Sequence, residues 1–134
     1  MERNFETVMI EQCSPVLAGL KAAGLFRYET RDCKDLAERV RGWNARLGEK
    51  GLRVRVLKGC VRSHWYLVYV YRESRLREVL EDENVRAFLA QEGYTLSENG
   101  GCEPLLRQLS QRLCCEAEFP HEIGVFLGYP LTDV

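Results

Sequence analysis

The sequence has no long hydrophobic run. Its longest apolar stretch extends from Trp65 to Tyr71, far shorter than the roughly 20 residues that a helix needs to cross a bilayer. The first residues, MERNFETVM, have no apolar core of the kind that a secretion signal contains. We therefore expect no membrane partner and a cytoplasmic protein.

The sequence also lacks an excess of charge of one sign. It has 19 basic and 20 acidic residues, which gives a formal net charge of −1. Such a chain has no overall field that attracts nucleic acid or an anionic surface. Arginines alternate along residues 53–55, but this is typical of the solvated side of a strand, so we expect no nucleic-acid partner. With 134 residues and 46% hydrophobic residues, the chain is predicted to fold as a single domain, 1–134.

Motifs for phosphate and metal binding are missing as well. No G-x-G-x-x-G or G-x-x-x-x-G-K is present. The pair His121–Glu122 begins like the zinc motif H-E-x-x-H, but Val125 occupies the position of the second ligand. None of the six cysteines forms a C-x-x-C pair, so their spacing predicts no metal site and favours free thiols in a reducing compartment.

The N-terminal third of the chain shows helix signals. Residues 4–12 are predicted to form a helix that ends at Cys13 and Ser14, because Pro15 disfavours helical geometry in the residue before it. A second short helix is expected to start at Pro15, to bury Leu20 and to end at Gly24. Residues 25–29 read as a short extended segment. Asp32 is the expected N-cap of a longer helix whose apolar residues recur three or four apart at Leu36, Val40, Trp43 and Leu47.

The middle of the chain predicts a β-hairpin. Residues 52–58 alternate, with Leu52, Val54 and Val56 on one face and Arg53, Arg55 and Leu57 on a solvated face. Residues 65–71 are apolar on both faces, which is typical of a central strand. Helical patterns follow at 73–81, at 85–92 and from Pro104 onward. This order predicts an α+β fold, a small antiparallel sheet packed by several short amphipathic helices.

The last stretch, FPHEIGVFLGYPLTDV, predicts a short buried helix. Pro120 suits a first turn, and Gly128 followed by Pro130 suits an end in the left-handed conformation. Gly124 permits a close approach by another segment. We expect Ile123, Phe126 and Leu127 to be seated against the sheet.

Four segments resemble a known family. They are CSPVLAGLKAAGLF at 13–26, LVYVYR at 67–72, the pair Gly93–Tyr94, and residues 119–134. Together they are similar to the bacterial family of domains of unknown function numbered 3793 (DUF3793). The resemblance covers nearly the whole chain and implies no activity for any residue. It also implies further aromatic-rich sequence after Val134, so that the chain would be either a natural short form or one that lacks its C-terminal part.

Three functional hypotheses remain open. A non-enzymatic interaction or adaptor domain, with a protein partner or self-association, fits the packing signals and is placed first. A thiol enzyme would use Cys13 as the nucleophile, since a helix start lowers the pKa of a thiol, with His121 as its base and Glu122 orienting the ring. A haem or metal-ligand binding protein would draw on Cys13, His64 or His121. The sequence identifies no cofactor.

Overall fold

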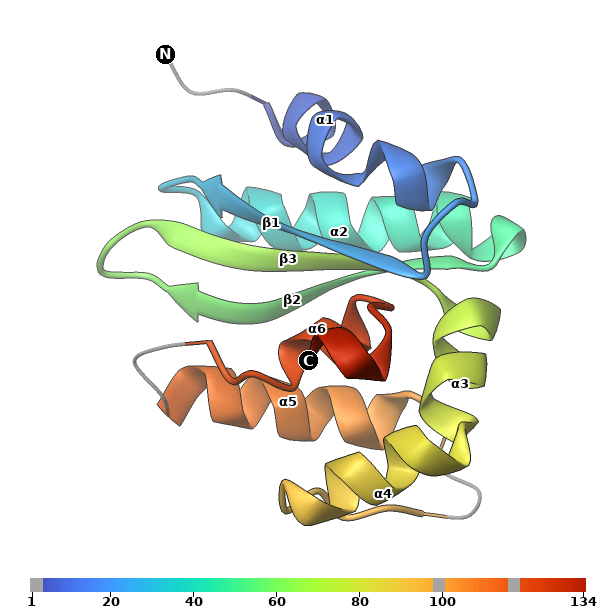
Figure 1. Ribbon diagram of the computed structural model, residues 1–134. Helices are drawn as coiled ribbons and strands as arrows, with labels where there is room; N and C mark the ends of the chain where they lie inside the picture. The colour runs from blue at the N-terminus through green and yellow to red at the C-terminus, as the bar shows by residue number, and fades with distance from the viewer. Residues whose placement is uncertain (1–3, 98–100, 116–118) are drawn as a thin grey trace.

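A three-stranded antiparallel sheet separates two groups of helices in the computed structural model, which describes residues 4–97, 101–115 and 119–134 (Figure 1). The strands β1 (Ala23–Glu29), β2 (Leu52–Cys60) and β3 (Trp65–Arg72) lie in the order β1-β3-β2. On one side lie α1 (Phe5–Leu17) and α2 (Cys33–Leu47). On the other lie α3 (Glu73–Glu81), α4 (Glu83–Gln91), α5 (Glu103–Cys115) and α6 (Ile123–Phe126). This arrangement confirms the predicted α+β class and the hairpin.

Strand β3 contributes to a hydrophobic core on each side of the sheet. Tyr66, Val68 and Val70 belong to the core beneath α1 and α2. Leu67, Tyr69 and Tyr71 alternate with them and belong to the core that α3, α5 and α6 complete. Because successive side chains of a strand point to opposite faces, an unbroken apolar strand must be covered twice. The prediction of a central strand is confirmed.

The predicted solvated face of β2 is wrong. Leu57 lies on the face that alternation gives it, but it belongs to the core on the α5 side, and a bulge between Val56 and Lys58 shifts the register with β3 at this point. Ser110 of α5 donates a hydrogen bond to the Leu57 carbonyl, and Arg55 donates one to Glu103 at the start of α5. Helix α5 therefore covers the face that alternation assigned to water, and only Arg53 is exposed there.

The chain between α1 and β1 also differs from the prediction. The predicted break at Cys13 is confirmed as a kink inside α1, where φ is −118° and ψ is 16°, but the second helical segment ends at Leu17 and not at Gly24. The turn that follows uses Gly19 at a φ of 82°, while Gly24 lies inside β1. A Cβ on Gly24 would lie 3.0 Å from the Cys13 sulfur, so this glycine allows α1 to pack closely on the sheet. Leu20, which was expected to be buried, is 75% exposed.

Helix α2 begins and docks as the sequence indicates. The Asp32 carboxylate accepts a hydrogen bond from the Asp35 backbone N–H at 2.9 Å, which confirms the predicted N-cap. Further along, Asn44 binds both backbone groups of Val54 in the edge strand β2. Its Nδ2 donates to the Val54 carbonyl at 2.8 Å, and its Oδ1 accepts from the Val54 N–H at 2.7 Å. The side chain thus takes the place of a neighbouring strand.

Replacing Asn44 with alanine will lower the free energy of unfolding by about 1–3 kcal/mol, because a donor and an acceptor of β2 lose their partners in a half-buried location. Urea denaturation followed by circular dichroism measures this change. Asn84→Ala on the exposed surface of α4 is the matched control and should stay within about 0.5 kcal/mol of the wild type. Equal effects of the two substitutions would contradict a docking role for Asn44.

The remaining helices follow the predicted order with small shifts at their ends. Helix α4 begins at Glu83, because the Asp82 carboxylate caps it by accepting from the N–H groups of Asn84 and Val85. Helix α5 begins at Glu103, one residue before Pro104. Within the described ranges, the longest helices are too short and too polar to pass through a bilayer.

Candidate functional site

The C-terminal segment folds back between α5 and the sheet (Figure 1). Its short helix α6 buries Val125 and Phe126 completely, while Ile123 and Leu127 are half-buried. Gly128 ends the helix at a φ of 84°, as predicted, and a Cβ there would lie 3.1 Å from the Cβ of Ala22. The predicted close approach at Gly124 is confirmed too, since a Cβ on it would lie 3.0 Å from Val134.

This path carries His121 and Glu122 to the C-terminal end of α4. There they meet Glu92, the residue that directly follows the helix. His121 Nε2 lies 2.9 Å from Glu92 Oε1. One ligand atom each from Glu92, His121 and Glu122 lies within 4.8 Å of the others, and we call these three residues the Glu92 cluster. Two of its members were singled out from the sequence.

Glu122 is the buried member of the Glu92 cluster, with 2% of its surface exposed. Its Oε2 accepts hydrogen bonds from the Tyr94 hydroxyl and from Arg112 Nη1, both at 3.2 Å. The Arg112 guanidinium also lies over the Tyr94 ring, 4.1 Å from its centroid. A buried carboxylate needs such donors, because an unpaired charge away from water is costly. Both donors use the same oxygen, so neither of them occupies Oε1.

His121 is the exposed member. Its ring meets the edge of Phe88 from α4, with the centroids 6.0 Å apart. Together with the contact to Glu92, this packing holds the imidazole beside the end of α4. The negative end of a helix dipole lies there, which favours a positive charge.

Cys13 lies on the other side of the sheet, in the core beneath α1 and α2. Its side chain is fully buried, and burial raises the pKa of the thiol to about 11, although Lys21 acts in the opposite direction. A nucleophilic cysteine requires the reverse shift. The structure brings His121 and Glu122 together but places Cys13 in a different core, so the geometry offers no support for a Cys13–His121 pair.

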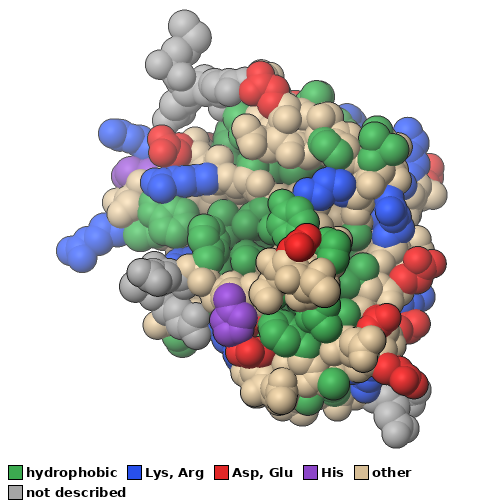
Figure 2. All heavy atoms as spheres, in the orientation of Figure 1, with side chains coloured by type: hydrophobic (Ala, Val, Ile, Leu, Met, Phe, Trp, Pro, Cys, Tyr) green, Lys and Arg blue, Asp and Glu red, His purple; other side chains and the backbone are tan. Residues whose placement is uncertain are grey.

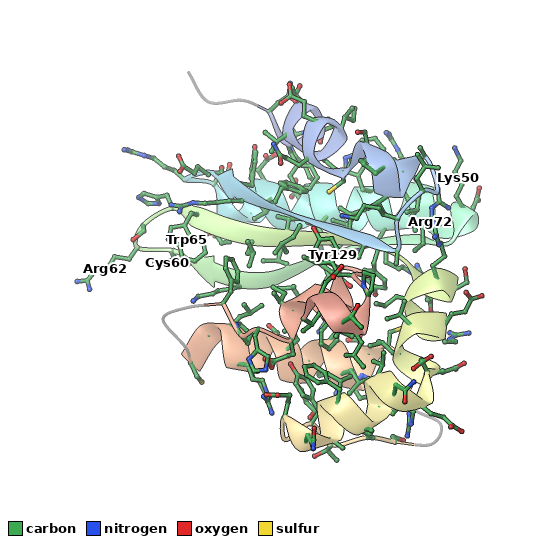
Figure 3. The ribbon with its side chains drawn as sticks, viewed as in Figure 1. Lys50, Cys60, Arg62, Trp65, Arg72 and Tyr129 are labelled. Atoms are coloured by element: carbon green, nitrogen blue, oxygen red, sulfur yellow. The ribbon has the colours of Figure 1, made fainter. Side chains whose placement is uncertain are left out.

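Further residues with ligand or thiol chemistry lie where β2 turns into β3, the region in which Figure 3 labels Cys60, Arg62 and Trp65. His64 lies in this turn at a φ of 59°, outside the Glu92 cluster. Hydrogen bonds from Ser63 lower the pKa of the Cys60 thiol. Arg27 and Lys58 flank the nearby Trp65 ring, at 5.0 and 5.7 Å from its centroid. The sequence did not single out Cys60, because only the turn after β2 brings its hydrogen-bond partner Ser63 close to the thiol.

A groove runs between α3, α4 and the C-terminal segment, with a volume of about 790 Å³. We call it the α4 groove. On the side of the groove formed by the C-terminal segment, Tyr129 is 48% exposed. The Lys21 ammonium lies over the Tyr129 ring, 4.8 Å from its centroid. The described residues that line the groove include no lysine, arginine or histidine. They are Glu78, Val79, Asp82, Asn84, Val85, Ala87, Phe88, Gln91 and residues 128–132.

The fold is that of an α+β protein with a sheet between two hydrophobic cores. Its C-terminal segment packs against α4 and α5. Residues 9–134 match the family model described as protein of unknown function (DUF3793), and the chain belongs to this family. The match confirms the resemblance of its segments. No curated protein and no solved structure matches the chain.

Proposed function

We propose that the protein is a non-enzymatic interaction module whose α4 groove binds a basic amphipathic helix of a partner protein. The observation that carries the proposal is the lining of the groove. Apolar side chains such as Val85, Phe88 and Leu131 line it together with the acidic Glu78 and Asp82, and no basic side chain of a described residue does. A groove of this kind is complementary to a helix with an apolar stripe flanked by lysine or arginine.

The shape of the groove supports a helical ligand. Helices α3 and α4 form two of its walls, and residues 128–132, which run into the 3-10 helix Leu131–Asp133, form the third. Val79, Phe88 and Leu131 are half-buried, which leaves part of each side chain accessible for contact. A helix presents anchors at i, i+3, i+4 and i+7, and such anchors can lie along a groove of this kind.

Charge favours the basic partner. Glu78 and Asp82 line the groove, and Glu81 and Glu83 are exposed beside them on α3 and α4. Figure 2 shows acidic side chains along the side of the molecule on which α3 and α4 lie, next to hydrophobic side chains around the C-terminal segment. Each exposed ion pair contributes only about 0.2–1 kcal/mol, so the charges select and orient the partner while apolar burial supplies most of the affinity.

Ala87→Arg will block the α4 groove, because it places a long cation among apolar side chains at an exposed position. The probe is a fluorescent helical peptide of leucines on one face and lysines on the other. We expect its dissociation constant, measured by anisotropy, to rise at least tenfold. Ala45→Arg on α2, across the sheet, is the matched control and should leave binding unchanged (Figure 1).

Glu78→Lys tests the charge separately and should weaken binding about fivefold, whereas Glu38→Lys on α2 should not. Absence of peptide binding, or equal binding to a leucine–glutamate peptide, would refute the proposal. So would a dimer in analytical ultracentrifugation that Ala87→Arg dissociates, because the groove would then be occupied by a second copy of the chain.

A further inference from the structure

We propose that the Glu92 cluster binds a divalent first-row transition-metal ion through Glu92, His121 and Glu122. An imidazole nitrogen with two carboxylate oxygens is a donor set suited to ions such as Mn²⁺, Fe²⁺ and Zn²⁺. The proposal is independent of the α4 groove. It differs from the sequence analysis, in which residue spacing predicts no metal site.

The geometry of the cluster is close to that of a bound state. The three ligand atoms lie within 4.8 Å of one another. Ligands at about 2.0–2.2 Å from a tetrahedral ion are separated by roughly 3.3 Å, so the cluster must contract by about an ångström and a half. His121 is exposed and Glu92 is half-buried, so small shifts of these two side chains can close this distance while Glu122 stays in place.

Glu122 provides the fixed part of the site. Tyr94 and Arg112 hold its carboxylate through Oε2, while Oε1 is used by neither. Buried hydrogen-bond partners of this kind orient the first ligand of a metal site and reduce the conformational entropy that binding costs. Tyr94 and Arg112 are thus positioning residues.

Charge in the cluster also suits a cation. Glu92 and Glu122 bring two negative charges, and Arg112 compensates one of them through its ion pair with Glu122 at 3.2 Å. An imidazole that binds a metal is neutral, so in that form the cluster has a net negative charge next to the C-terminal end of α4, which itself favours a cation. A plain surface pair between His121 and Glu92 would explain their contact but not why a buried third carboxylate lies beside it.

Binding would connect two segments far apart in the sequence. Glu92 follows α4, whereas His121 and Glu122 precede α6, and 28 residues separate Glu92 from His121 by residue number. An ion shared by them would fix the C-terminal segment to the end of α4. Metal binding should therefore raise the thermal midpoint of unfolding, since an ion held only by the native state shifts the equilibrium toward it.

Titration with Mn²⁺ followed by electron paramagnetic resonance tests the site. Mn²⁺ is the probe because it accepts imidazole and carboxylate ligands, whereas thiolates of the six cysteines would compete for Zn²⁺. We expect one bound ion per chain and dissociation constants at least tenfold higher in His121→Ala and Glu92→Gln. Both substitutions are at residues outside the buried core, so the variants should fold. His64→Asn, which removes the other histidine at a position with positive φ, is the control.

Paramagnetic broadening in an NMR spectrum locates the ion. The proposal requires broadening of the amides near residues 92–94 and 121–123. Broadening centred on the acidic residues of α3, absence of Mn²⁺ binding, or equal affinity in His121→Ala and the wild type would overturn it.

Discussion

Replacing Phe126 with alanine is expected to lower the free energy of unfolding by about 3–5 kcal/mol. Phe126 is fully buried, its ring lies 5.9 Å from that of Tyr94, and its carbonyl accepts a hydrogen bond from the buried Tyr69 hydroxyl. Loss of the ring leaves a cavity between α6 and β3 that the fixed backbone around it cannot close. Urea denaturation at neutral pH measures the loss.

Phe119 provides the matched control for this substitution. It lies in the same segment but is 61% exposed, so Phe119→Ala should change stability by less than about 0.5 kcal/mol. A small effect of Phe126→Ala would mean that the C-terminal segment detaches easily from the core. That outcome would also weaken the α4 groove, because Tyr129 and Leu131 form one of its walls.

Stability should fall steeply between about pH 9 and pH 11. Burial raises the pKa of Cys13 and of Cys102 from 9.0 to about 11. In this window the folded protein keeps two protons that the unfolded chain releases, so a rise in pH favours unfolding. A shift of about two units corresponds to roughly 3 kcal/mol per thiol. Burial also raises the pKa of Tyr71 from 10.0 to about 12 and that of Tyr69 well above 10.0, so these two tyrosines add to the loss of stability above about pH 10.

The pH dependence of urea midpoints separates the thiols from other groups. The double variant Cys13→Ala/Cys102→Ala should be less stable at pH 8 but lose less stability on going from pH 8 to pH 10, where the thiols act without the tyrosines. Cys33→Ala/Cys114→Ala, at exposed positions, should keep the slope of the wild type. Identical slopes in all three proteins would show that both buried thiols lose their protons as easily in the folded as in the unfolded state.

The elements whose signals are local could be predicted from the sequence. The apolar run in β3, the Asp32 cap of α2 and the Gly128 end of α6 each follow from chemistry within a few residues. The wrong predictions concern residues whose burial depends on a segment that is distant in the sequence. Alternation in β2 correctly placed Leu52 and Val54 on one face and Leu57 on the other, but only the docking of α5 explains why Leu57 is buried.

In the candidate sites, too, local features could be predicted from the sequence, whereas contacts between distant segments could not. His121 and Glu122 are adjacent in the sequence, and their ionisable groups could be noticed there. Glu92 could not be connected with them, because the contact depends on how the C-terminal segment crosses α5 and reaches α4. Cys13 was considered beside a helix start, yet the kink at that residue turns its sulfur toward Gly24 instead of toward solvent. Helix position alone does not determine the exposure of a thiol.

The alternation along β3 has a consequence for how the molecule folds. With Val68 and Val70 in one core and Tyr69 and Tyr71 in the other, each core can be completed only once this strand is in register with β1 and β2. Neither half can reach its full packing density alone. The chain should consequently behave as one cooperative unit, in which damage to the helices on one side of the sheet weakens those on the opposite side.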